Sequence, residues 1–275
     1  MKLNFHKSLW EVQCTNPSEL THYLNVIKNE GYQGTELFLP FYSIDVDTTL
    51  KAHAEFGLDI ITGIATDGTD IKQHLTSLTK QVEQALEFSP TLINCHTGRD
   101  IFSLKDNLML FEAALKLEQK HNITITHETH RFRPTFSTFG TEQIINELPE
   151  LKLNLDISHW MVVHESDLSD QIERLKKLFK SVYHIHGRVG FEEGPQVTNP
   201  EDERWQAHLI NHTQLWQKVV DNAAARQDNS FTITPEFGPF PYAHILPATG
   251  EHLADIWRAN RFMKQHLSEQ LTTPK

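Results

Sequence analysis

Cysteine and long apolar runs are scarce in this chain of 275 residues. The two cysteines, Cys14 and Cys95, are too few for a disulfide framework, so we expect a reducing, cytoplasmic location. No stretch approaches the roughly 18 apolar residues of a membrane-spanning helix. Asn4, His6 and Lys7 also interrupt any apolar run that could serve as a secretory signal. We therefore expect a soluble protein with no membrane partner.

Basic residues are outnumbered by acidic ones, which gives a formal net charge of -11. Binding to nucleic acid is disfavoured, because affinity for a phosphate backbone comes mainly from Lys and Arg. The content of 39% hydrophobic and 22% charged residues is typical of a globular chain with a substantial core. The length is close to that of a (β/α)8 barrel, which folds as one unit, so we expect residues 1–275 to form a single domain.

Strand-like apolar patterns alternate with helical patterns along the whole chain. The strand patterns lie near residues 2–8, 33–39, 59–64, 91–96, 122–128, 151–157, 181–187 and 231–236. Eight such alternations predict an α/β fold, a single (β/α)8 TIM barrel of parallel strands. From capping residues we expect helices to begin just after Asn16, Ser103, Ser166, Asn199 and Thr249, the fourth being the longest.

Polar residues occupy one face of the late strands. In a barrel covered by helices the outer strand face must be apolar, so the polar rows face the lumen and end at the carboxyl rim. By this alternation Glu128, Asp156, His186 and Glu236 occupy equivalent positions on strands five to eight. A frame shifted by one residue would have placed at least one of them against the helices.

Three carboxylates and one imidazole form a ligand set for one divalent metal ion. Mostly oxygen donors favour manganese, magnesium or cobalt, and zinc stays open. The alternative is that these are buried polar residues satisfied by one another. Three carboxylates buried together without a cation would repel one another and lose hydration, so we favour the metal site.

Further side chains fall at the predicted rim and are candidates for substrate binding. His96 ends strand four and points inward, and His159 lies on the loop after strand six, where a purely structural role is an equal alternative. An arginine cluster would suit an anionic substrate or would neutralise the metal-site carboxylates: Arg99, Arg131, Arg133 and Arg188. Aromatic residues on the same segments could wall a pocket: Trp10, Phe38, Phe41, Trp160, Phe237, Phe240 and Tyr242. His6 and Glu36 are weaker candidates for polar contacts across the lumen.

These motifs resemble the xylose isomerase-like TIM-barrel superfamily of sugar isomerases and epimerases, with endonuclease IV as a distant relative. The local signals are "DISH" from Asp156 to His159, which matches the family's D-x-x-H, and "HIH", whose second histidine, His186, matches the family's ligand. The resemblance implies that Glu128 and Glu236 bind metal and also act as a general acid/base pair. The implied reaction is isomerisation or epimerisation of a sugar, sugar phosphate or sugar acid by proton transfer through a metal-stabilised enediolate.

The chain departs from the pattern of ketose 3-epimerases. Pro134 stands where those enzymes place a substrate-binding acid, and Glu192 stands where they place an arginine. A lyase or dehydratase with the same metal chemistry is the runner-up, and a barrel that binds without turnover is a third reading. An endonuclease IV-like hydrolase is disfavoured because "LDIITGIATDG" has no histidine and "NPEDERWQAH" lacks the aspartate–x–histidine pair. The substrate and any pairing of subunits into a homo-oligomer stay open.

Overall fold

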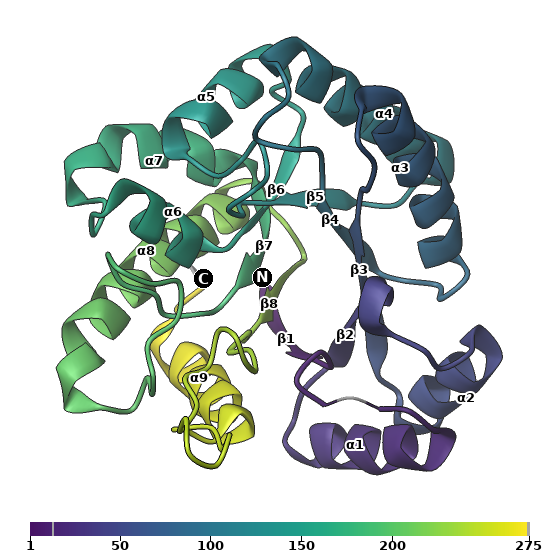
Figure 1. The fold of residues 1–275 in the computed structure, drawn as a ribbon, viewed down its shortest axis with the longest axis vertical. Coiled ribbons are helices and arrows are strands. Elements are labelled where there is room, and N and C mark those ends of the chain that lie inside the picture. The colour runs from purple at the N-terminus through teal and green to yellow at the C-terminus, as the bar shows by residue number, and fades with distance from the viewer. Residues whose placement is uncertain (13, 274–275) are drawn as a thin grey trace.

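A closed barrel of eight parallel strands forms the centre of the computed structural model, which describes residues 1–12 and 14–273 (Figure 1). The strands are β1 Lys2–Ser8, β2 Gly34–Phe38, β3 Asp59–Ala65, β4 Leu92–His96, β5 Ile125–Glu128, β6 Lys152–Leu155, β7 Val182–His186 and β8 Ser230–Thr234. Lys2 pairs with Ser230 and Phe5 with Ile233, which joins the first strand to the last. The predicted single (β/α)8 barrel is confirmed.

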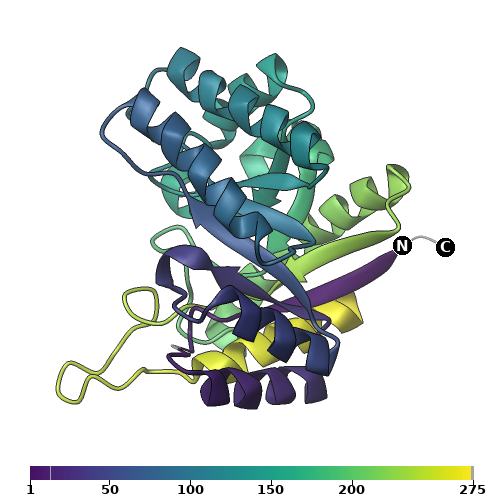
Figure 2. The same ribbon diagram turned by 90° about the vertical axis from the view of Figure 1, so that its right-hand side faces the viewer.

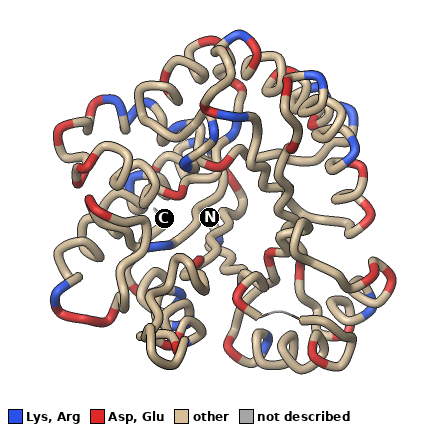
Figure 3. Tube along the Cα trace, viewed as in Figure 1, with Lys and Arg blue, Asp and Glu red and all other residues tan. Residues whose placement is uncertain are grey.

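Helices surround the barrel on its outside (Figures 1 and 2). They are α1 Pro17–Asn29, α2 Val46–Phe56, α3 Ile71–Leu86, α4 Leu104–His121, α5 Thr138–Glu147, α6 Ile157–His164, α7 Ile172–Leu178, α8 Gln206–Ala225 and α9 Ile256–Gln270. Short 3-10 turns are η1 Leu39–Phe41, η2 Ser169–Gln171, η3 Phe179–Ser181 and η4 Glu203–Trp205. No described helix is long and apolar enough to cross a membrane. Charges of both signs are interspersed along the outer helices (Figure 3).

Two of the expected helix starts are confirmed by their caps. Asn16 Oδ1 accepts a hydrogen bond from the Glu19 backbone N–H at 3.0 Å at the start of α1. Ser103 Oγ does the same for the Asp106 N–H at 3.1 Å at the start of α4. These side chains satisfy backbone donors that have no partner within the first helical turn.

Three of the expected helix starts are wrong by several residues. Ser166 and Asn199 accept hydrogen bonds from backbone N–H groups only two residues ahead, so each closes a turn. The following helices, α7 and α8, begin later, although α8 is the longest described, with 20 residues. Thr249 likewise bonds to Glu251, and Asp255 caps α9 instead. A polar residue in a loop can complete either a turn or a helix cap, and its sequence does not separate the two.

Strand register staggers the inward residues along the barrel. Glu128 on β5 pairs with Asn154 on β6, and Asn154 pairs with His184 on β7. Asp156 and His186 therefore each lie two residues beyond the register level of Glu128. The strands of a closed barrel tilt, so residues of one face rise from strand to strand. Strands six and eight also end before the expected residues, at Leu155 and Thr234.

The outward faces of the late strands are apolar, as the alternation predicts, but the layer between strands and helices also holds buried histidines. Ile125, Leu153 and Ile233 are fully buried beneath the helices. His127 shares this outer layer and places Nδ1 2.6 Å from Thr97 Oγ1. Burial lowers the pKa of His127 to about 3, because the charged imidazolium would lose its hydration. Burial likewise lowers the pKa of His212 in α8 to about 4.

We predict that stability falls on mild acidification because of these buried histidines. The unfolded chain takes up protons below its ordinary histidine pKa of about 6.5, whereas the folded chain does not until near the lowered value. Each such histidine should therefore lower the free energy of unfolding by about 2 kcal/mol between pH 8 and pH 5. Urea unfolding at several pH values measures this slope.

The contribution of one site can be isolated by substitution. His127→Leu should flatten the slope, whereas His22→Gln, at an exposed position of α1, should leave it unchanged. Equal slopes for the wild type and His127→Leu would contradict the assignment.

Candidate metal and substrate site

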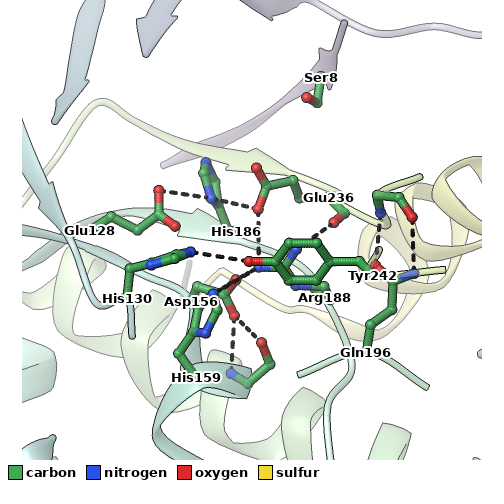
Figure 4. A network of polar contacts seen from close by, with 12 residues as sticks. Ser8, Glu128, His130, Asp156, His159, His186, Arg188, Gln196, Glu236 and Tyr242 are labelled. Carbon is green, nitrogen blue, oxygen red and sulfur yellow. Dashed lines mark hydrogen bonds and ion pairs between the residues drawn. The ribbon is translucent and has the colours of Figure 1, made fainter. Parts of the chain in front are cut away.

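The four predicted ligands meet at the carboxyl end of the barrel (Figure 4). Glu128 and His186 end β5 and β7, Asp156 is the N-cap of α6, and Glu236 lies two residues past β8. One nitrogen or oxygen atom from each of the four lies within 4.8 Å of the corresponding atoms of the other three. Glu128, Asp156 and His186 are buried, and the Glu236 side chain is 16% exposed. The structure thus brings together all four residues that strand alternation selected.

His186 lies among three carboxylates. Its Nδ1 is 2.9 Å from Glu236 Oε2 and 3.4 Å from Glu128 Oε2, and its Nε2 is 2.9 Å from Glu36 Oε1. Burial alone would lower the pKa of His186, but the negative charges of Glu236, Glu36 and Glu128 raise it well above the ordinary value. Despite the short distance to Glu236, Nδ1 has no hydrogen-bond partner in a suitable direction. A buried nitrogen without a partner, facing two carboxylates, fits a divalent cation between them.

Asp156 is held at both carboxylate oxygens. Oδ1 accepts hydrogen bonds from the Ser158 backbone N–H at 3.0 Å and from the Ser158 hydroxyl at 2.5 Å. Oδ2 pairs with the guanidinium of Arg188. Burial raises the pKa of Asp156, while the Arg188 charge opposes this shift. Arg188 is itself buried, lies 3.5 Å from Glu236 Oε2 and stacks on the Tyr242 ring at 4.4 Å.

Two further groups of potential ligands adjoin this set. His96 Nε2 lies 2.8 Å from Glu128 Oε2, and His96, Glu128 and His130 form one group. Glu36, His184 and His186 form the other. Both groups share a residue with the first set, so the residues at the rim do not fix the number of ions by themselves.

A cavity of about 220 Å³ opens next to the four convergent residues. Its polar lining includes Glu128, His186, Arg188, Glu236 and His96. Aromatic side chains form its walls: Trp10, Phe38, Phe41 and Tyr242. Ser8, Glu36, Asn94 and His130 complete the lining. A few polar groups converging in an aromatic-walled cavity are typical of a small-molecule site.

Some predicted substrate contacts lie outside this cavity. Trp160 is fully buried, donates its indole N–H to the Thr135 carbonyl at 2.9 Å and belongs to the main core, which corrects the expectation of a substrate contact. His159 lies in α6 and not in a loop. It is completely buried and contacts Arg188 at 3.2 Å behind the cavity wall.

The expected arginine cluster is not assembled at the cavity. Among the described residues, Arg188 is the arginine that lines it, and its charge is already paired with carboxylates. Arg131 does not line the cavity, and its guanidinium lies 5.9 Å from the centre of the Tyr242 ring. Arg133 donates to the backbone carbonyls of Thr66 and Gly98. Arg99 stacks on the Phe132 ring.

Three residues that line the cavity were not among the candidates predicted from the sequence: Ser8, Asn94 and His130. Of these, His130 can bind or exchange a proton. It lines the cavity, and its Nε2 is 3.1 Å from the Tyr242 hydroxyl. The signal was present, because His130 follows Glu128 by two residues and so shares its face where the strand direction continues.

Comparison with known proteins places this geometry in a family. The profile of the family described as "Xylose isomerase-like TIM barrel" matches residues 24–205. The chain belongs to this family. No curated protein sequence gives a significant match.

Solved structures of several enzymes share the fold of this xylose isomerase-like chain at low identity. D-allulose 3-epimerase from Methylomonas sp., solved with D-allulose, is 14% identical, with 98% of this chain and 97% of that chain covered and a TM-score of 0.67. The probable 3-DHS dehydratase of Bacillus anthracis is 17% identical, with 88% and 94% covered and a TM-score of 0.62. Endonuclease IV from Thermus thermophilus is 12% identical, with 98% and 100% covered and a TM-score of 0.58. At these identities the likeness shows the fold alone.

We predict that Arg188 contributes strongly to stability by compensating buried carboxylates. In buffer containing a chelator, Arg188→Gln should lower the free energy of unfolding by about 3 kcal/mol, because it leaves Asp156 buried without its counter-charge. Arg131→Gln serves as the control and should cost less than about 1 kcal/mol, because Arg131 is partly exposed. Similar urea midpoints for the two variants would contradict this assignment.

Proposed function

We propose that this chain is a divalent-metal-dependent isomerase or epimerase that acts on a small carbohydrate by proton transfer. The observation that carries the proposal is the placement of Glu128 and Glu236. They come from different strands, approach the same His186 nitrogen and both line the cavity. Two carboxylates on different sides of one bound substrate can act as a general acid/base pair.

The site residues would bind a metal ion and, through it, activate the substrate. We assign Glu128, Asp156, His186 and Glu236 to one divalent ion, with manganese, magnesium or cobalt favoured over zinc. The bound ion would supply an electrophile that polarises the substrate carbonyl and lowers the energy of the enediolate. Burial alone would raise the pKa of Glu128, but His96 and His186 hold it well below its ordinary value, so this carboxylate is ionised, which is the form that binds a cation.

The outcome depends on how many carboxylates transfer the proton. If Glu128 and Glu236 act on opposite faces of the same carbon, the centre is inverted and the reaction is an epimerisation. If one carboxylate moves the proton between neighbouring carbons, the reaction is an aldose–ketose isomerisation. The cavity confines the substrate between these groups and the aromatic walls, which holds the reacting carbon near them.

The volume and the charge of the cavity indicate the kind of substrate that it would bind. About 220 Å³ is smaller than the sites of drug-sized ligands, which begin near 300 Å³, so a single sugar unit is the favoured size. Because the Arg188 charge is already paired with Asp156, we favour an uncharged sugar over a phosphate or sugar acid. The proposal includes a role in carbohydrate metabolism and a location in the cytoplasm.

A metal-dependent lyase is the second candidate. The same removal of a proton beside a carbonyl leads to dehydration when a hydroxyl leaves from the neighbouring carbon. The fold shared with the probable 3-DHS dehydratase supports a lyase as the second candidate. Its product contains a new double bond, which separates it from an isomerase or epimerase in any product analysis.

We predict that the metal-loaded protein incorporates solvent deuterium into carbon-bound positions of at least one sugar in a panel of ketoses and aldoses. Elemental analysis of the same sample should give one divalent ion per chain. Glu236→Gln should lower the exchange rate by at least about 100-fold, because one proton-transfer group is lost.

The matched control is Glu83→Gln, an exposed carboxylate on α3, which should exchange at the wild-type rate. Nuclear magnetic resonance or mass spectrometry of the recovered sugars measures the exchange. Full exchange in Glu236→Gln would refute the acid/base assignment. A protein that binds no metal and exchanges no proton would refute the proposed function.

A further inference from the structure

Glu36 reaches across the barrel lumen to the back of His186. It lies on β2, 150 residues before His186 in the chain, and is 5% exposed. Its Oε1 is 2.9 Å from His186 Nε2, and its Oε2 is 3.3 Å from His184 Nε2. The Asn94 side-chain amide donates to Glu128 Oε2 at 2.8 Å and lies 3.4 Å from Glu36 Oε1. The carboxylate therefore touches the site from behind, on the side away from Glu236.

The hydrogen-bond chemistry of this contact determines which nitrogen of His186 carries a proton. An ionised carboxylate can only accept hydrogen bonds. The close nitrogen of His186, Nε2, must therefore donate to Glu36. When Nε2 holds the proton of a neutral imidazole, Nδ1 presents a lone pair. Nδ1 is the nitrogen that faces Glu236 and Glu128 and has no hydrogen-bond partner.

We propose that Glu36 is a positioning residue that fixes the tautomer and ring orientation of His186, so that Nδ1 faces the metal as its ligand atom. This inference rests on the proposed metal-dependent function. A carboxylate or carbonyl that accepts from the second nitrogen of a metal-binding histidine commonly orients the ring and strengthens the ligand. Here the carboxylate is supplied by a strand on the far side of the lumen.

His184 holds Glu36 in place for this role. It is fully buried on β7 and occupies the second oxygen of the carboxylate. Its Nδ1 lies 2.7 Å from Thr232 Oγ1 on the neighbouring strand β8. With both oxygens engaged, the Glu36 carboxylate cannot rotate without losing a buried hydrogen bond. In the "HIH" motif, His184 therefore holds the Glu36 carboxylate in place, and His186 faces the proposed metal site.

The first test measures metal affinity and needs no substrate. Isothermal titration with Mn²⁺ should give a dissociation constant about 10- to 100-fold higher for Glu36→Ala than for the wild type. Glu36→Gln retains one acceptor oxygen, so its dissociation constant for Mn²⁺ should lie between those of the wild type and Glu36→Ala. The matched control is Thr35→Val on the opposite face of the same strand, where the hydroxyl pairs with His53 and not with the site. This control should bind Mn²⁺ within about 2-fold of the wild type, since it removes one buried hydrogen bond remote from the ligands.

The second test observes the tautomer directly in the unsubstituted protein. In Zn²⁺-loaded protein labelled with ¹⁵N-histidine, the His186 ring should show a protonated Nε2 and a metal-bound Nδ1, with the signal assigned by its loss in His186→Gln. A protonated Nδ1 with a metal-bound Nε2 would overturn the inference even if the Glu36 variants fail to fold. Unchanged Mn²⁺ affinity in a folded Glu36→Ala would overturn it while leaving the proposed function intact. A wild-type protein that binds neither Mn²⁺ nor Zn²⁺ would overturn both.

Discussion

The compensation of buried negative charge governs the carboxyl end of this barrel. Glu36, Glu128 and Asp156 are almost completely buried, and Glu236 lies beside them. Carboxylates gathered in a region of low dielectric repel one another and lose their hydration, so each requires a positive or donating partner. The polar contacts of the lumen supply these partners: Arg188, His96, Asn94, His184 and Ser158. His186 contacts three of the carboxylates at once, which makes its ring the centre of the arrangement.

The strands and their inward-facing residues could be predicted from the sequence because successive side chains of a strand alternate between its two faces. Helices cover every outer strand face, so apolar residues such as Ile125 and Ile233 have to alternate with inward polar ones. This rule was enough to select the eight strands and the four convergent residues. It also accounts for His127, which shares the outer face with Ile125 and lies in the apolar layer. The alternation does not give the stagger between strands, and so it could not show that Glu128 is level with Asn154 and not with Asp156.

The irregular segments could not be predicted in the same way. The direction of an arginine after a strand end depends on several torsions and on the partners within reach. Arg133 therefore turned to backbone carbonyls while Arg188 turned to Asp156. Trp160 follows Asp156 by four residues, and only the helix that begins directly after Asp156 directs its ring into the core. Glu36 appeared as a weak candidate because its partner lies 150 residues away, and pairing at that separation leaves no local pattern.

The pairing of β1 with β8 makes the site a property of the entire chain. The four convergent residues lie at the ends of strands β5 to β8, whereas Glu36 lies on β2 and Trp10 follows β1, near the seam where the first and last strands pair. During synthesis, Glu36 leaves the ribosome long before Glu236, so the two can share one histidine only after the last strand has closed the ring. A half barrel, whether made by truncation or exchanged between related genes, would carry either the ligands or their support. Diversification of this protein is therefore restricted to changes that preserve both halves together.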